Sequence, residues 1–186
     1  DYKIAIIGSG PGGLSAAGHA AELNVPHVLI EKAAHLSDTL FKFQKGKFVM
    51  STPDVLPLRS PMPFAAGKRE DILGNWDDTA ASLNVNVKLS TEVVGVEGEK
   101  GNFTIKLGDG STITAEAVIL GIGLQGNLNK LRVPGADLPH IQYQLDDPDE
   151  YELERIIVIG AGDAAIENAV ALSVRNTVYV LNRGED

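Results

Sequence analysis

Apolar residues gather in short β-branched runs that are followed by glycines and then by an alanine-rich stretch. The first run, Tyr2–Ile7, ends at a glycine, and the alanine-rich segment Pro11–Leu23 comes after it. Another apolar run covers Pro26–Ile30. Continuous apolar runs of this length are typical of buried strands, and the alanine-rich segment favours a helix. This part of the chain predicts a strand, a tight turn, a helix and a second strand.

The pattern changes in the middle of the chain. Residues 34–67 contain several prolines and little periodicity, which predicts a long irregular segment with at most a short hairpin around Lys45–Lys47. Apolar positions at helical spacing then predict a helix over Gly67–Leu83. Runs of strand-forming residues follow, and we predict strands at Val85–Leu89, Glu92–Val96, Asn102–Leu107, Ser111–Thr114 and Val118–Leu120, with a hairpin turn at Gly108–Gly110.

The opening pattern returns near the end of the chain. Arg155–Ile159 is again an apolar run that ends at a glycine, Ala164–Leu172 is again helix-forming, and Val178–Leu181 is a further apolar run. The chain therefore predicts two strand–helix–strand units separated by an antiparallel meander. We predict an α/β fold: a Rossmann-like three-layer domain that carries the meander, and the start of a second Rossmann domain.

The first predicted turn carries a dinucleotide fingerprint. Gly8, Gly10 and Gly13 satisfy G-x-G-x-x-G between a strand and a helix, where glycines allow a tight turn, approach of a diphosphate and close helix–strand packing. Glu31 ends the next strand, where an acid accepts hydrogen bonds from a ribose. A βαβ unit whose glycines serve only packing is the alternative. We predict a nucleotide site lined by Gly8, Ser9, Gly10, Pro11, Gly12, Gly13, Glu31 and Lys32.

The second predicted turn carries the G-x-G-x-x-A form of the same fingerprint. No acid ends the following strand, and Arg183 can pair with a ribose 2′-phosphate there, which favours NADPH over NADH. Alternatively, Arg183 only ends a strand and either nucleotide is accepted. Asp163 is interpreted mainly as a stabiliser of the helix N-terminus. The predicted site comprises Gly160, Gly162, Asp163, Ala164, Ala165, Asn182 and Arg183.

Composition excludes several other classes of function. The chain has a net charge of −9 and scattered basic residues, which argues against a nucleic-acid or membrane partner. It has no cysteine, so disulfides, thiolate metal sites and a redox-active CxxC pair are excluded within these residues. Its four histidines show no metal-ligand spacing, and we predict no metal site. Without a membrane-length apolar run or a secretion signal, we expect a soluble cytoplasmic protein.

Together these motifs resemble the FAD domain of flavoproteins with two dinucleotide-binding domains, the pyridine nucleotide-disulfide oxidoreductases and flavin monooxygenases. The resemblance rests on the first fingerprint with Glu31, on Thr91–Val94, on the Phe103–Thr114 hairpin and on Ala117–Gly123. It implies FAD at the first turn and NAD(P)H at the second. It also implies adenine contacts from the backbone of Val93 and Val94, whose side chains we expect in the core. Gly121 and Gly123 are expected beside FAD, although the family's threonine is replaced by Ile122.

The run Leu131–Pro139 is similar to thioredoxin reductase-type proteins, but the following interval His140–Pro148 lacks their CxxC pair. The chain is closer to members without that pair, the thioredoxin reductase-like ferredoxin-NADP reductases and bacillithiol disulfide reductase-like proteins. This implies an FAD domain over residues 1–123, a connection over 124–153 and the first part of an NAD(P) domain over 154–186. We expect a fragment of a longer protein that lacks the family's closing FAD segment.

The expected activity is hydride transfer from NAD(P)H to FAD, followed by electron transfer to a protein or small molecule. Two alternatives stay open: a redox-sensing or regulatory module without turnover, and a flavin monooxygenase. No side chain is a convincing acid, base or nucleophile, and Asp38 and Thr39 are named only as residues near the flavin, with a solvated loop as the alternative. For the assembly of the protein, a homodimer is left open.

Overall fold

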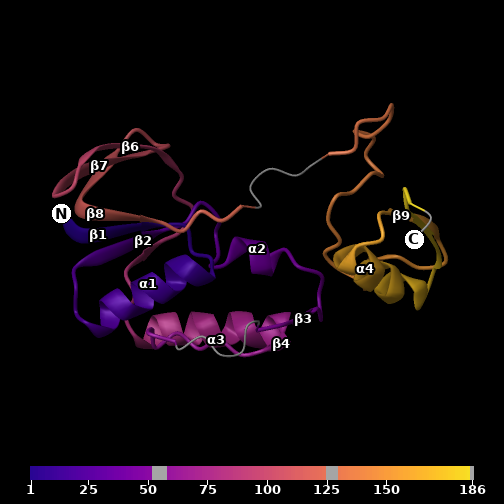
Figure 1. Cartoon of the computed structure of the whole chain (residues 1–186), viewed down its shortest axis with the longest axis horizontal. Helices are drawn as coiled ribbons and strands as arrows, with labels where there is room; N and C mark the ends of the chain where they lie inside the picture. Colours follow the sequence, from indigo (N-terminus) through magenta and orange to yellow (C-terminus); the bar gives the residue numbers. More distant parts are fainter. Residues whose placement is uncertain (52–57, 125–129, 185–186) are drawn as a thin grey trace. The chain divides into compact units, whose positions relative to one another are not determined.

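The chain forms two compact units in the computed structural model, which describes residues 1–51, 58–124 and 130–184 (Figure 1). Unit 1 comprises Asp1–Phe41 and Phe48–Asn129. Unit 2 comprises Lys42–Lys47 and Lys130–Asp186. The short segment Lys42–Lys47 therefore belongs to unit 2, although it interrupts unit 1 in the sequence.

Unit 1 is built around a six-stranded sheet with the strand order β5-β2-β1-β8-β7-β6. The four strands β5, β2, β1 and β8 are parallel, and β7 and β6 continue the sheet antiparallel. Their bounds are β1 Tyr2–Ile7, β2 His27–Ile30, β5 Val87–Lys88, β6 Val93–Glu99, β7 Asn102–Leu107 and β8 Thr112–Leu120. The predicted Rossmann strands and the predicted meander therefore belong to one sheet.

Strand β8 joins the two halves of that sheet. The sequence predicted two strands, Ser111–Thr114 and Val118–Leu120, but residues 112–120 form one continuous strand. Its first half pairs antiparallel with β7, its second half pairs parallel with β1, and Ala115 pairs with both neighbours. The prediction was wrong because the intervening Ala115, Glu116 and Ala117 are weak strand formers, yet strands on both sides of β8 hold them extended.

Helix α1 (Pro11–Glu22) packs against the inner strands β1 and β2 of this sheet, and α3 (Arg69–Ser82) lies beside β4 (Gly67–Lys68) and residues 38–41. Helix α1 begins with a proline at its first turn and buries Leu14, Ala17 and Ala20. Helix α3 buries Ile72, Trp76 and Ala80, the apolar face that the sequence predicted. Trp76 Nε1 donates a hydrogen bond of 2.6 Å to the Pro63 carbonyl, so α3 anchors the irregular segment that precedes it.

The irregular segment contains more structure than the sequence predicted. Residues 38–41 form the one-turn helix α2 (Asp38–Phe41). A turn does form at Gln44–Lys47, but the strand after it, β3 (Phe48–Val49), pairs with β4 (Gly67–Lys68) rather than with residues before the turn. Gly67 and Lys68 are thus a strand and not the start of α3. Short-range patterns could not reveal this pairing, because its partners are far apart in the sequence.

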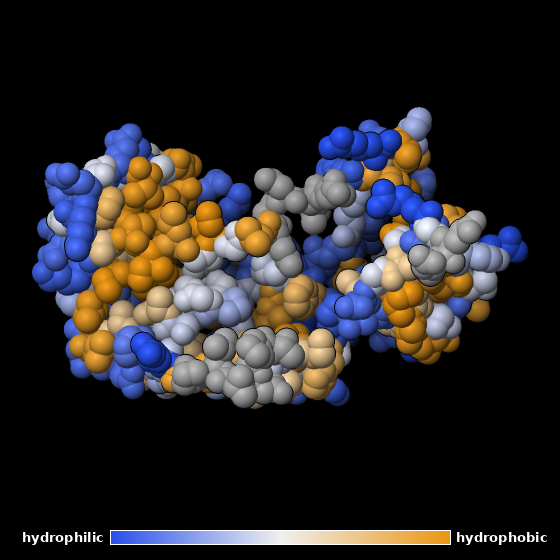
Figure 2. All heavy atoms as spheres, viewed as in Figure 1, coloured by the Kyte–Doolittle hydropathy of each residue, from blue (hydrophilic) through white to orange (hydrophobic). Residues whose placement is uncertain are grey.

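The core of unit 1 combines side chains from the parallel strands and from the antiparallel meander. Ala5, Ile7, Val28 and Ile30 of the parallel strands form one cluster with Ile105, Leu107 and Ala115 of the meander. Other apolar side chains stay exposed on the same sheet, and Figure 2 shows apolar surface over its strands. Exposed apolar residues on β6 and β8 include Val94, Val96, Ile119 and Leu120.

Unit 2 contains one strand–helix–strand unit, as the sequence predicted. Strands β9 (Arg155–Ile159) and β10 (Thr177–Leu181) are parallel and are connected by α4 (Asp163–Ser173). The 3-10 helix η1 (Pro148–Glu150) precedes them. Among the described residues of this unit, only Ala169 and Leu172 are buried apolar residues. A two-stranded sheet with one helix offers little surface for a core of its own.

Over residues 1–51, 58–124 and 130–184, no helix has the length and apolar character needed to cross a bilayer. Within the same ranges, no cluster of three or more histidines and carboxylates could hold a metal ion.

Candidate dinucleotide-binding sites

The first glycine turn lies where three parallel strands end. Gly8 N–H donates to the Ile30 carbonyl of β2 at 2.8 Å, and Gly121 N–H donates to the Ile7 carbonyl of β1 at 2.7 Å. A Cβ atom at Gly13 would lie 1.8 Å from the Gly8 carbonyl oxygen, and one at Gly8 would lie 2.5 Å from the Gly121 oxygen. Gly8 also has a φ of 95°. Side chains are thus excluded here by backbone contact alone.

The other glycines of this turn leave open space instead. A Cβ at Gly10 would meet its nearest atom at 4.0 Å, and one at Gly12 would meet nothing within that distance. Gly10 is the N-cap of α1, no side chain caps the helix, and its first turn holds no acidic residue. Because uncapped amides and the helix dipole attract anions, this helix start suits a diphosphate.

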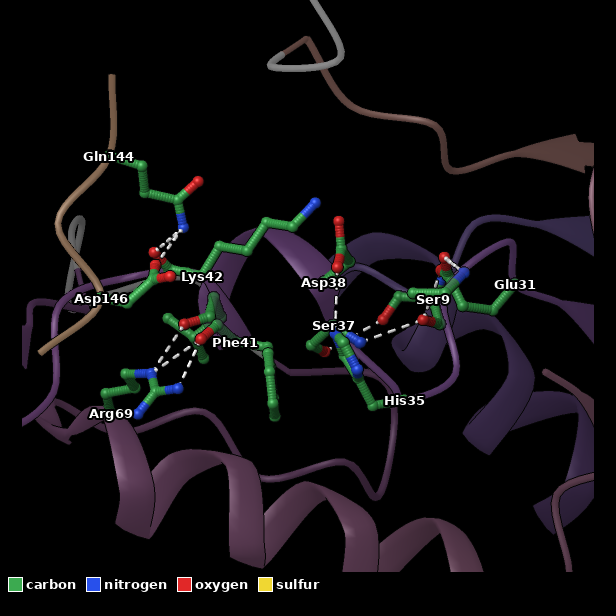
Figure 3. Close-up of polar contacts among 12 residues, drawn as sticks. Ser9, Glu31, His35, Ser37, Asp38, Phe41, Lys42, Arg69, Gln144 and Asp146 are labelled. Carbon is green, nitrogen blue, oxygen red and sulfur yellow. Dashed lines mark hydrogen bonds and ion pairs between the residues drawn. The ribbon is translucent and has the colours of Figure 1, made fainter. Parts of the chain in front are cut away.

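Glu31 lies beside this turn in a buried position. Its Oε2 accepts hydrogen bonds from Ser9 N–H at 2.8 Å and Ser9 Oγ–H at 2.6 Å, and its Oε1 accepts one from Ala33 N–H at 2.9 Å (Figure 3). Ser9 is fully buried and Glu31 is 8% exposed. The predicted ribose acid and the predicted turn residue are therefore in direct contact.

The segment that leads into the residues predicted beside an adenine contacts Glu31. Thr91 N–H donates to the Glu31 carbonyl at 2.8 Å, which holds the start of β6 against the end of β2. Lys32 forms an exposed ion pair with Glu92 at 2.9 Å. The hydrogen bond to Glu92 and the negative charge of that carboxylate raise the pKa of Lys32 above its ordinary value. This ion pair connects the residue that follows Glu31 with the residue that precedes β6.

Val93 and Val94 differ in their surroundings. Val93 packs against the core cluster, but Val94 is 63% exposed, so the expectation that both side chains are buried was wrong for Val94. Successive side chains of a strand face opposite sides of the sheet, so Val94 points away from the cluster that Val93 contacts, at the place where the register between β6 and β7 shifts. The two glycines predicted beside FAD after β8 also differ in their surroundings. Gly121 packs against Gly13, while Gly123 has open space around it.

Asp38 and Thr39 begin the one-turn helix α2. The Asp38 carboxylate bonds His35 Nε2 at 2.9 Å, and the His35 ring stacks on Phe41 with ring centres 3.6 Å apart (Figure 3). Arg69 Nε donates to the Phe41 carbonyl at 3.0 Å. Thr39 is exposed. Asp38 is therefore part of a polar and aromatic cluster, and its place near the flavin stays a prediction.

Sequence reasoning missed Ser37, which is 1% exposed and has a φ of 55°. Its N–H donates to Ser9 Oγ at 3.0 Å, and its hydroxyl donates to the Ser9 carbonyl at 3.0 Å. The available signal was a serine followed by an acid and a threonine, a pattern that favours a short turn or cap. That pattern did not reveal its partner, which lies 28 residues away.

The second glycine turn repeats the first with looser packing. Gly160 has a φ of 115° and donates its N–H to the Leu181 carbonyl at 2.8 Å. A Cβ there would lie 3.9 Å from the Ala165 Cβ, so an alanine fits the third fingerprint position. Gly162 is the N-cap of α4, and no side chain, including that of Asp163, caps the helix. Ala164 follows Asp163 within its first turn.

Asn182 and Arg183 follow β10 and are both exposed. Arg183 N–H donates to Asn182 Oδ1 at 2.9 Å, so the asparagine shapes the backbone after the strand. Arg183 therefore lies just after the carboxyl end of β10. This is the end of the strand at which doubly wound folds bind nucleotides.

Comparison with known proteins decides the family, because the family described as pyridine nucleotide-disulphide oxidoreductase matches residues 5–186. The chain belongs to this family. The resemblance proposed from the sequence is confirmed. The absence of cysteine from the chain distinguishes it from members that use a thiol pair.

Curated relatives of this family member include two bacterial proteins named ferredoxin--NADP reductase. The one from Leuconostoc citreum is 27% identical over 176 residues, covering 92% of this chain and 49% of the relative. The one from Gluconobacter oxydans is 29% identical over 187 residues, covering 97% of this chain and 52% of the relative. The chain thus spans about half the length of these relatives.

Solved structures of related proteins share the fold. Bacillithiol disulfide reductase from Staphylococcus aureus is 26% identical with a TM-score of 0.85, over 100% of this chain and 58% of that one. Thioredoxin reductase from Lactococcus lactis is 20% identical with a TM-score of 0.75, over 100% of this chain and 57% of that one. The predicted Rossmann-type fold class is confirmed.

Proposed function

We propose that the chain is the dinucleotide-binding part of an oxidoreductase that transfers hydride from NAD(P)H to FAD and then passes electrons to an acceptor. The observation that carries this proposal is the pair of glycine turns, each at the carboxyl end of parallel strands and each followed by a helix without a side-chain cap. Two diphosphate-sized anion sites in one chain suit two dinucleotides.

The residues of the first turn fit FAD. Gly10 and Gly12 leave space for a diphosphate, no acid repels it from the first turn of α1, and Glu31 supplies a carboxylate for a ribose. Bound FAD would supply the electron chemistry that the side chains lack. The part of the chain around these residues would bind, orient and shield it. These residues lie within the FAD domain proposed over residues 1–123, which the proposed connection over 124–153 follows.

The second turn suits a nicotinamide dinucleotide. Gly160, Gly162 and Ala165 form its cradle, and Arg183 offers a positive charge for a 2′-phosphate. This supports an NAD(P) domain that begins at residue 154, with NADPH preferred. Asp163 in the first turn of α4 stabilises the helix start and does not take part in hydride transfer.

The electron acceptor is proposed to be an electron-carrier protein or a small molecule. The curated relatives carry the name ferredoxin--NADP reductase, and a chain without cysteine cannot reduce its acceptor by dithiol exchange through its own thiols. An iron–sulfur electron carrier fits both facts. A regulatory module that only binds the two nucleotides is the second candidate, because no described side chain is an evident acid, base or nucleophile.

Anaerobic mixing of NADPH with the FAD-loaded protein separates these functions. We expect the absorbance of oxidised flavin to disappear and to return when an electron acceptor is added. Binding of both nucleotides without this bleaching would contradict hydride transfer and favour the regulatory module. Oxygen-dependent conversion of an added substrate would instead indicate a monooxygenase.

Arg183 sets the expected nucleotide preference. In the Arg183→Ala variant we expect the KM for NADPH to rise about tenfold, because one charge-assisted contact to a phosphate is lost. The KM for NADH should change less than about twofold, since NADH lacks that phosphate. Steady-state kinetics with both nucleotides measure this. Arg175→Ala, which removes an exposed arginine from the same unit, is the control, and equal effects of the two variants would exclude a specific role for Arg183.

A further inference from the structure

The fully buried Ser9 connects Glu31 to Ser37 in a polar chain that the fingerprint itself does not require (Figure 3). Ser37 donates its N–H to Ser9 Oγ, and Ser9 Oγ donates its hydrogen to Glu31 Oε2. Each hydroxyl hydrogen has one acceptor, so the direction of every bond in this chain is determined. These hydrogen bonds connect the loop before α2 to the carboxylate of Glu31, the predicted ribose acceptor.

The two carboxylate oxygens of Glu31 differ in their remaining capacity. Oε2 accepts two hydrogen bonds, both from Ser9, and these occupy both of its lone-pair positions. Within the described part of the chain, Oε1 accepts one, from Ala33 N–H, and one of its lone-pair positions remains. The network therefore leaves a single strong acceptor position on Oε1.

Ser37 has a backbone conformation that serine rarely adopts. A serine with a φ of 55° occupies the left-handed region, which glycine or asparagine would adopt more easily. In this conformation both its N–H and its hydroxyl reach Ser9. Glycine would remove the strain but also the hydrogen bond from the hydroxyl, and only the N–H would still donate to the Oγ and the carbonyl of Ser9. The hydroxyl is thus kept at a position where the backbone disfavours it.

We propose that Ser9 and Ser37 are positioning residues that fix the Glu31 carboxylate so that Oε1 accepts a hydroxyl of the adenosine ribose of FAD. This rests on the proposed function of the first site, and it adds two residues and one atom to it. Ser9 acts through Glu31, and Ser37 acts through Ser9. The pair would therefore favour FAD over FMN, because FMN lacks the adenosine half.

A double-mutant cycle on FAD affinity tests the inference. It compares wild type, Ser9→Ala, Glu31→Gln and the double variant by titration of flavin-free protein with FAD and with FMN. We expect Ser9→Ala to weaken FAD binding about tenfold, as for loss of one hydrogen bond to a charged group. In the Glu31→Gln background the same change should alter FAD affinity less than about twofold. FMN affinity should change less than about twofold throughout.

Two further variants make the test robust. Ser37→Gly removes the hydroxyl while suiting the positive φ, so it should fold and weaken FAD binding about threefold. Ser111→Ala is the matched control, because Ser111 bonds one oxygen of Asp109 through both its N–H at 2.9 Å and its hydroxyl at 2.6 Å in an exposed turn. It should leave the affinity for FAD unchanged.

The outcomes distinguish the inference from the function on which it rests. Equal losses from Ser9→Ala in both backgrounds, or parallel losses of FAD and FMN affinity, would show a merely structural role and overturn the inference alone. Wild-type protein that fails to bind FAD would overturn the proposed function as well.

Discussion

Replacement of Gly13 by alanine is expected to lower the free energy of unfolding by about 3 kcal/mol or more. The new methyl group would lie 1.8 Å from the Gly8 carbonyl oxygen and 3.0 Å from the Gly8 carbonyl carbon. Both are backbone atoms, so no rotamer change can relieve the overlap. Helix α1 would have to move away from β1, and the first nucleotide site would be distorted.

Chemical denaturation of the flavin-free protein measures this effect, with Gly12→Ala as the control. Gly12 lies one position earlier in the same helix, and a Cβ there meets nothing within 4 Å. Its replacement should change the free energy of unfolding by less than about 1 kcal/mol, with helix propensity favouring alanine. Similar midpoints for Gly13→Ala and wild type would contradict the helix–strand contact described above.

Replacement of Glu31 by alanine is expected to lower the free energy of unfolding by about 2–4 kcal/mol and FAD affinity about a hundredfold. The variant removes the acceptor of three hydrogen bonds at a site where Ser9 is fully buried. Buried donors without a partner are costly because water cannot replace the lost acceptor. The affinity for FAD should fall further in Glu31→Ala than in Ser9→Ala, because Glu31→Ala removes the carboxylate that is proposed to accept the ribose hydroxyl.

Denaturation of the flavin-free protein and FAD titration test both parts of this prediction. Glu116→Ala is the control, since Glu116 forms an ion pair with Lys3 on the surface of the same sheet and both side chains are more than half exposed. Exposed pairs contribute less than about 1 kcal/mol. If Glu31→Ala were no more destabilising than Glu116→Ala, the buried network would not contribute to the fold, and if it bound FAD normally, Glu31 would not hold the ribose.

The two glycine turns show how packing tolerance follows from local geometry. In unit 1 the third fingerprint position touches the carbonyl of the first, and only glycine fits. In unit 2 the third position holds Ala165, and a Cβ added at the first position, Gly160, would meet its nearest atom, the Ala165 Cβ, at 3.9 Å. A Cβ added at the first position of unit 1, Gly8, would meet its nearest atom at 2.5 Å, so the turn of unit 1 is packed more tightly than that of unit 2.

The sequence by itself determined the elements that local patterns specify. Apolar runs predicted β1, β2, β9 and β10, alanine-rich or amphipathic stretches predicted α1, α3 and α4, and glycine spacing predicted both turns. These features depend on residues within about one helix turn or strand of each other, so their signals are visible along the chain. The family and the fold class followed from them.

Only the tertiary structure decided which distant residues meet. The pairing of β3 with β4, the single strand β8 shared by two kinds of neighbour and the outward turn of Val94 all depend on partners far away in the sequence. The same is true of Ser37, which is unremarkable in sequence until the fold brings it to Ser9 and Glu31. Local propensity cannot encode such contacts, because their free energy is gained only after the chain has brought the partners together.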